Sequence, residues 1–181
     1  MMRDGTTERR LHGHDVSDLM GLSVVLDGAI EITESDGEVS TEIPDPEGLA
    51  AAAAVARCLI PIRLQPSELR ALRHIADWTA SDLAGMLGEK TAAETISRWE
   101  TGKQSMGGYV EKVFRLLVCE HLHGRAPGVD YTAGAIARLV ILDPARSDAE
   151  FKVPTIHLGH VSMKVDHKRM QVWDVEQPIA A

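Results

Sequence analysis

The sequence predicts an α+β fold with a small N-terminal β meander, a central all-α domain of about five helices and a C-terminal β-hairpin. Three observations support this order. Short strand-like runs before residue 47 are separated by Asp-Gly pairs, which are hairpin signals. Residues 47–142 are rich in helix-forming residues with apolar spacings of three and four. After Pro144 the apolar residues alternate with polar ones, as in strands.

Residues 1–17 are polar and lack periodicity, so we expect a mobile tail. Residues 18–47 are expected to form the β module. In it Val24–Leu26 and Ala29–Thr33 are joined by Asp27-Gly28, and Val39–Ile43 follows a second Asp-Gly pair. A three-stranded meander is the predicted product, and three strands need something to pack against.

The acidic residues concentrate in this N-terminal part. Residues 1–50 hold three bases and twelve acids, a balance of 3 − 12 = −9, whereas residues 51–181 hold sixteen bases and fifteen acids. An acidic region of this kind is either a solvated face or a surface for a basic partner.

Residues 48–62 are expected to form a connecting helix, because the stretch is rich in alanine and Pro61 ends it. Residues 63–145 are expected to form the helical domain. Its first helix follows Pro66, Gly88 and Gly102 interrupt the next two, and 109–122 and 131–142 are the last two.

Residues 146–181 are predicted to be a C-terminal extension. The alternating runs 155–165 and 169–175 flank a turn, so we expect a β-hairpin that pairs either with the N-terminal sheet or with a second subunit.

The segment 78–106, "WTASDLAGMLGEKTAAETISRWETGKQSM", carries the strongest functional signal. Thr79 or Ser81 caps its first helix. A second helix over about 92–101 is expected to bury Ile96 and Trp99, which share one face at a spacing of three. The side chains on the opposite face then point outward, and Arg98 is one of them.

This pattern resembles the λ-repressor-like (Xre) helix-turn-helix, particularly at "DLAGMLG" and "TISRWETGK". The resemblance implies that the second helix enters the major groove of DNA. One departure is that the connection from Gly88 to Thr95 is about two residues longer than usual. Glu89 also stands where an apolar residue is normally found.

A wider resemblance covers about residues 20–123, from "GEVSTEIPDPEGL" to "YVEKVFRLLV", and points to the MqsA/YgiT-like antitoxin and regulator family. The resemblance implies a zinc-binding β module before the helix-turn-helix domain. Here Thr33 and Asp36 stand where zinc-binding cysteines are expected, and His12 with His14 cannot supply four ligands. We therefore expect a degenerate module with no metal and no cofactor.

Arg98 is the central candidate for DNA contact, because a guanidinium can bind phosphate or a guanine edge. The alternative is a surface ion pair with Glu94, four residues earlier. Glu94 itself repels phosphate unless it accepts from a cytosine amino group. The full set of candidate DNA-binding residues is Thr79, Ser81, Lys90, Ala93, Glu94, Thr95, Ser97, Arg98, Lys103 and Gln104.

The helical region is not basic: from Arg63 to Glu120 eight bases meet eight acids. The overall net charge of −8 also argues against a protein that coats nucleic acid indiscriminately. Affinity for DNA is therefore expected to need a homodimer that reads two half-sites of a double-stranded operator.

No nucleophile elbow, phosphate-binding loop or carboxylate pair is present, so we expect no enzyme. Cys119 and His123 have a metal-ligand spacing, but a buried thiol and a helix-end histidine explain them better. The apolar run near residue 50 is too short to span a bilayer, and no apolar stretch follows the charges of "MMRDGTTERR". We expect no membrane association, a cytoplasmic location that becomes nucleoid-associated on DNA, and reduced Cys58 and Cys119.

The sequence thus predicts a sequence-specific transcriptional regulator, a dimeric repressor of its own operon. The alternative is an antitoxin or anti-regulator whose acidic N-terminal part binds a basic toxin or regulatory protein.

Overall fold

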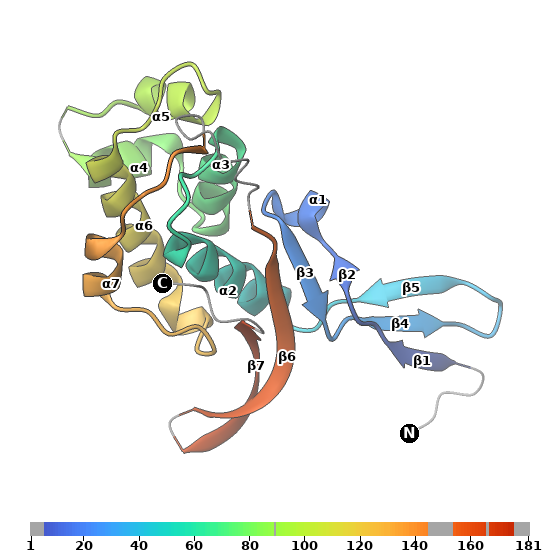
Figure 1. The fold of residues 1–181 in the computed structure, drawn as a ribbon. Helices are drawn as coiled ribbons and strands as arrows, with labels where there is room; N and C mark the ends of the chain where they lie inside the picture. Colours follow the sequence, from blue (N-terminus) through green and yellow to red (C-terminus); the bar gives the residue numbers. More distant parts are fainter. Residues whose placement is uncertain (1–5, 89, 145–153, 166, 176–181) are drawn as a thin grey trace.

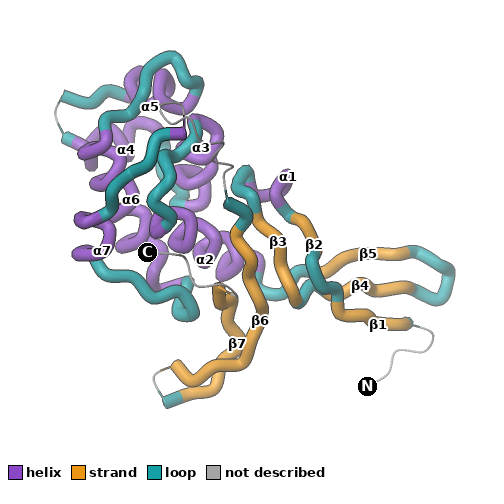
Figure 2. Tube along the Cα trace, in the orientation of Figure 1, coloured by secondary structure: helices purple, strands orange, loops and turns teal. Residues whose placement is uncertain are grey.

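The structure, a computed structural model, describes residues 6–88, 90–144, 154–165 and 167–175 of the chain. Within these residues the fold is α+β, with seven α-helices and two sheets of three and four strands. Six helices, from α2 (Pro46–Leu59) to α7 (Ala133–Arg138), gather into one body, the four-stranded sheet lies along α2, and the three-stranded sheet extends away from these helices (Figure 1). The mixed class therefore agrees with the expectation, and Figure 2 shows how strands occupy the two ends of the chain.

None of the described helices is long and apolar enough to cross a membrane.

The helical body is made of short helices that follow one another closely in the chain. Their bounds are α2 Pro46–Leu59, α3 Pro66–Ile75, α4 Ala80–Leu87, α5 Ala93–Glu100, α6 Gly108–Leu122 and α7 Ala133–Arg138, with a short α1 at Ser17–Met20 and a 3-10 turn at His123–Arg125.

Helix α2 forms the centre of the core, with ten of its fourteen residues buried. It begins at Pro46, two residues before the expected start, because Asp45 caps it by accepting a hydrogen bond from the Gly48 amide at 3.0 Å. Because the alanine side chains of α2 are small, neighbouring elements can pack close to its backbone. Helix α6 packs on one side of α2, and strands of the larger sheet pack on another.

The two sheets differ in their exposure to solvent. The three-stranded sheet is antiparallel in the order β1-β4-β5, and most of its side chains are exposed. The four-stranded sheet, in the order β2-β3-β6-β7, has its two central strands parallel to each other. The strands are β1 Thr7–Arg10, β2 His14–Asp15, β3 Val24–Asp27, β4 Ile30–Thr33, β5 Val39–Glu42, β6 Ile156–Val165 and β7 Lys168–Val175.

The predicted three-stranded meander is wrong. Strand β4 does pair with β5, but β3 does not pair with β4, and the Asp27-Gly28 turn leads the chain from one sheet to the other. Gly28 has a φ of 130°, and a Cβ there would lie 2.8 Å from the Cβ of His160. Val24 and Leu26 are fully buried, so β3 is a core strand that pairs with β6 instead of a half-exposed hairpin strand.

The expected mobile tail over 1–17 is also corrected for its described part. Strand β1 pairs with β4, and β2 pairs with β3, so residues 7–15 contribute to both sheets. Short polar strands without alternation give no signal in the sequence, because long-range hydrogen bonds determine them. Residues 1–5 lie outside the described residues.

The expected C-terminal hairpin is present as β6 and β7, which pair antiparallel from Leu158↔Val175 to Val165↔Lys168. Of the two expected pairings, the structure shows the one with the N-terminal part, because β6 runs parallel to β3. Residues 146–153, 166 and 176–181 of the expected extension lie outside the described residues.

The last predicted helix, 131–142, is shorter than expected. Helix α7 ends at Arg138, and the following segment is extended. There the amide of Leu142 donates to the Pro61 carbonyl and the Leu142 carbonyl accepts from the Arg63 amide, both at 2.8 Å. These bonds to a distant segment replace the last helical turn.

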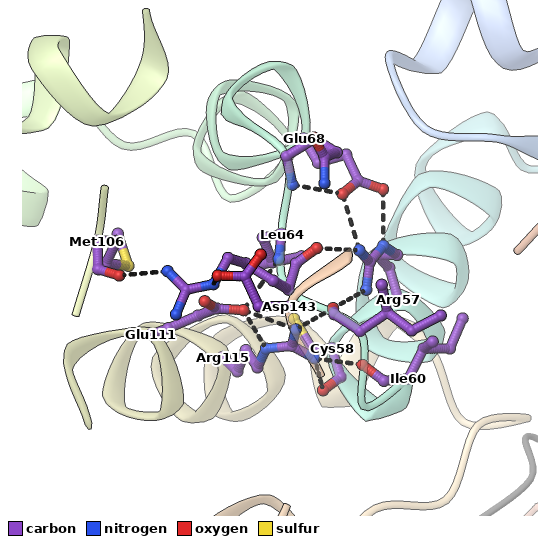
Figure 3. A network of polar contacts seen from close by, with 12 residues as sticks. Arg57, Cys58, Ile60, Leu64, Glu68, Met106, Glu111, Arg115 and Asp143 are labelled. Carbon is purple, nitrogen blue, oxygen red and sulfur yellow. Dashed lines mark hydrogen bonds and ion pairs between the residues drawn. The ribbon is translucent and has the colours of Figure 1, made fainter. Parts of the chain in front are cut away.

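A buried polar network joins α2, α3 and α6 to the segment between Leu59 and Gln65 (Figure 3). The Arg57 guanidinium donates to both carboxylate oxygens of Glu68, at 2.6 and 2.8 Å. The Arg115 guanidinium donates to Glu111 and to the carbonyls of Cys58, Ile60 and Ile62, and the Leu64 amide donates to Glu111. All four charged residues are at most 4% exposed, and each charge is compensated within the protein.

Candidate nucleic-acid interface

Helix α5 is held against the helical body by one apolar face. Ile96 is 1% exposed and Trp99 is 6% exposed, as the spacing of three residues predicts. The helix begins at Ala93 and ends at Glu100, close to the expected 92–101. Gly102 follows with a φ of 71°, the left-handed conformation in which helices commonly end.

An ion pair fixes the carboxyl end of α5 to α3. The Arg73 guanidinium donates to both Glu100 carboxylate oxygens, at 2.6 and 3.0 Å, and to the carbonyl of Trp78 at 2.8 Å. The hydrogen bonds to Glu100 raise the pKa of Arg73 above its ordinary value. The Arg73 and Glu100 side chains are only 12% and 10% exposed. Because the ion pair is also bidentate, it fixes the orientation of α5 as well as its position.

The opposite face of α5 is open to solvent. Glu94, Ser97 and Arg98 are exposed, while Ala93 and Thr95 are half-buried. Among the residues that the structure describes, Arg98 forms no ion pair with Glu94. The Arg98 guanidinium is therefore available to a ligand on this side of the helix.

The loops on either side of α5 bring more candidates to the same region. The backbone N–H of Gln104 donates to the Arg98 carbonyl at 3.2 Å, so the chain after Gly102 folds back on the end of α5. Lys103 and Gln104 are exposed there, and Lys90 is exposed in the connection before α5. Glu89, the departure noted in that connection, lies outside the described residues.

Thr79 and Ser81 lie at the start of α4. Of the two, Thr79 is the cap: its hydroxyl accepts from the Asp82 amide at 3.1 Å and donates to the Asp82 carboxylate at 2.6 Å. The Thr79 backbone amide donates to the same carboxylate. These bonds hold the pKa of Asp82 below its ordinary value, so a negative charge occupies this helix start. Ser81 is exposed in the first turn and leaves its hydroxyl free of the capping box.

Some features of this region carry little signal in the sequence. Arg73 and Glu100 are 27 residues apart, and only the crossing of α3 and α5 brings them together. Tyr109, in the first turn of α6, is 80% exposed, which is unusual for an aromatic side chain. Its position after Gly107-Gly108 is the only sequence feature that could have drawn attention to it.

The cysteines and histidines form a separate group. Cys58 and Cys119 are both buried, on the packed helices α2 and α6. The neighbouring Cys58 thiol and burial raise the pKa of the Cys119 thiol. The His123 ring instead lies edge-on to Tyr131, with centroids 5.2 Å apart. Among the described residues, no group of three His, Cys, Asp or Glu side chains is arranged to hold a metal ion.

Comparisons of the chain with protein-family models, with curated proteins and with solved structures gave no match.

Proposed function

We propose that the chain is a sequence-specific DNA-binding transcriptional regulator that reads the major groove with α5. One observation carries the proposal: Trp99 is 6% exposed while the neighbouring Arg98 is exposed and free of an ion pair with Glu94. A recognition helix needs this arrangement, with one face rigidly packed and the other able to reach base edges.

The surroundings of α5 support the same function. The helix is eight residues long, follows α4 in the chain and packs against both α4 and α3. This order agrees with the resemblance of residues 78–106 to λ-repressor-like helix-turn-helix motifs. In the proposed complex Arg98 contacts a guanine edge or a phosphate, Ser97 and Thr95 contact phosphates or bases, and Lys90, Lys103 and Gln104 contact phosphates.

The charge of the region indicates how the protein would reach useful affinity. The helical region has no surplus of basic residues, so a single copy neutralises few phosphates. Two copies that place their α5 helices about 34 Å apart would read two half-sites together. We therefore propose a dimeric repressor bound to a palindromic operator.

The test begins with selection of binding sites from a randomised duplex library by the purified full chain. Binding of the selected duplex is then measured for Arg98→Ala. Loss of a bidentate base contact costs about 1–3 kcal/mol, or roughly 5- to 150-fold in affinity. Arg98→Lys keeps the charge but not the fork of donors, so it should relax the preference at one base position.

Arg125→Ala is the matched control, because Arg125 is exposed in the 3-10 turn after α6 and belongs to a different part of the fold. It should leave affinity unchanged within about twofold. Failure to select any sequence, or specific binding by Arg98→Ala equal to that of the unmodified chain, would reject the proposed role of α5.

A further inference from the structure

The outer half of the β6–β7 hairpin, described for residues 161–164 and 167–171, has no cover from the rest of the described molecule. Strand β3 pairs with β6 only as far as Gly159, and β7 is an edge strand whose free side is bridged at Asp174 alone. Val161 and Met170 are 37% and 46% exposed, although both lie on the same face of the hairpin as the buried Val172. Figure 1 shows this half projecting below the helices.

The exposed end of this hairpin is basic. The sequence of residues 161–171 contains three bases, Lys164, Lys168 and Arg169, and one acid, Asp166. Lys168 and Arg169 lie on β7, where four consecutive residues from Lys168 to Gln171 are exposed. This stretch presents unpaired backbone groups along its open edge.

A second open edge of opposite charge lies on β5. This strand is the end of the order β1-β4-β5, and its four residues Val39–Glu42 are all exposed. Residues 30–42 hold the five acids Glu31, Glu34, Asp36, Glu38 and Glu42 and no base. Of these, Glu31 is already paired with Arg9 at 3.0 Å.

The charges determine which edges can pair. Two β5 edges would bring acids together, and two β7 edges would bring Lys168 and Arg169 together, so both like pairings are disfavoured. A β5 edge beside a β7 edge brings an acidic edge next to a basic one, so this pairing is the one that charge favours. Within one molecule the two hairpins extend in different directions and do not meet (Figure 1).

We propose that two copies of this chain associate through these edges, with the β7 edge of each copy pairing with the β5 edge of the other. Two-fold symmetry then produces two identical contacts and closes a dimer. The proposal goes beyond the DNA-binding function and does not depend on it, because the association is expected without DNA.

The experiment is sedimentation analysis of the full chain over a range of concentrations, at low ionic strength and without DNA. The unmodified chain should show a monomer–dimer equilibrium. Lys168→Glu with Arg169→Glu should lower the association constant about tenfold or more, and Glu38→Lys with Glu42→Lys should do the same, because each contact occurs twice in the dimer. The four substitutions combined should restore association.

The control is Arg70→Glu with Arg125→Glu, which changes the net charge by the same amount at exposed positions on α3 and the 3-10 turn and should leave association unchanged. Circular dichroism checks that every variant is folded. A chain that stays monomeric, a dimer insensitive to either reversal, or a combined variant that does not recover overturns the proposal. Growth into species larger than a dimer also overturns it, and so does a charge reversal on β5 or β7 that weakens DNA binding without lowering the association constant. Each of these leaves the test of Arg98 unaffected.

Discussion

Trp99 and Arg98 are adjacent in the chain and have opposite environments. The indole is 6% exposed and the guanidinium side is open to solvent. Successive residues of a helix lie about 100° apart, so a strongly packed residue directs its neighbour sideways and outward. The candidate site therefore depends on packing beneath α5 as much as on the residues that would touch DNA.

Substitution of Trp99 tests this dependence. The indole N–H has no hydrogen-bond partner among the described residues. Trp99→Phe thus removes volume but no hydrogen bond, and we expect a loss of about 1–2 kcal/mol in the free energy of unfolding, against about 3–5 kcal/mol for Trp99→Ala. Urea unfolding measures both. Equal losses for the two variants would show that the ring volume does not matter.

His160 should make stability depend on pH. Its ring lies 4.8 Å from the Trp173 ring, and burial first, with Arg10 second, lowers its pKa below the ordinary 6.5. As the pH falls, His160 therefore takes up a proton in the unfolded chain before it does so in the folded chain. The contribution of His160 to the free energy of unfolding is fully present above pH 6.5 and is lost as the pH falls through the lower pKa of the folded state.

We therefore expect His160→Phe to reduce the loss of stability between about pH 7.5 and pH 5.5 relative to the unmodified chain. Urea unfolding at several pH values across this range gives the comparison. Parallel curves for the two proteins would contradict the assignment to His160.

At the scale of elements, the connection from α2 to α3 is held by charges where an apolar core would be expected. The segment after Leu59 is extended, and its carbonyls would be buried without partners. Arg57 and Arg115 supply the donors, and Glu68 and Glu111 balance the charges. Arginine suits this role because one guanidinium offers five donors in a plane.

Arg115→Met should be among the most destabilising single substitutions in the protein. It leaves the Glu111 carboxylate, 1% exposed, without its cation, and it removes the donor to the Ile60 carbonyl. We expect a loss of about 3–5 kcal/mol in the free energy of unfolding.

Lys112→Met is the control on the same helix, because the Lys112 ammonium makes an exposed bond to the Ala137 carbonyl. Its cost should be within about 1 kcal/mol. If urea unfolding shows similar losses for Lys112→Met and Arg115→Met, the buried network contributes nothing specific.

At the scale of the whole molecule, Trp173 joins the C-terminal hairpin to the start of α2. Its indole N–H donates to the carbonyls of Pro44 and Asp45, both at 3.1 Å, directly before α2. The side chain is 2% exposed, and β7 reaches the core only because β6 pairs with β3, more than 130 residues earlier. The C-terminal hairpin is thus an integral part of the fold.

Trp173→Phe should keep the packing and lose the hydrogen bond, at a cost of about 1–2 kcal/mol, whereas Trp173→Ala should cost about 3–5 kcal/mol. Thermal unfolding followed by circular dichroism measures both. A Trp173→Ala variant as stable as the unmodified chain would mean that the hairpin is not coupled to the core.

The sequence by itself determined the order of helices α2 to α7 and the face of α5 that packs, because these follow from periodicity, capping residues and glycine positions within short windows. It also determined that residues 156–175 form a hairpin. Only the tertiary structure decided that β3 pairs with β6 and not with its neighbour β4, that residues 7–10 and 14–15 become strands, and that Arg73 meets Glu100. These features depend on backbone and charged groups that are far apart in the chain, and their partners become identifiable only when the core brings them within hydrogen-bonding distance.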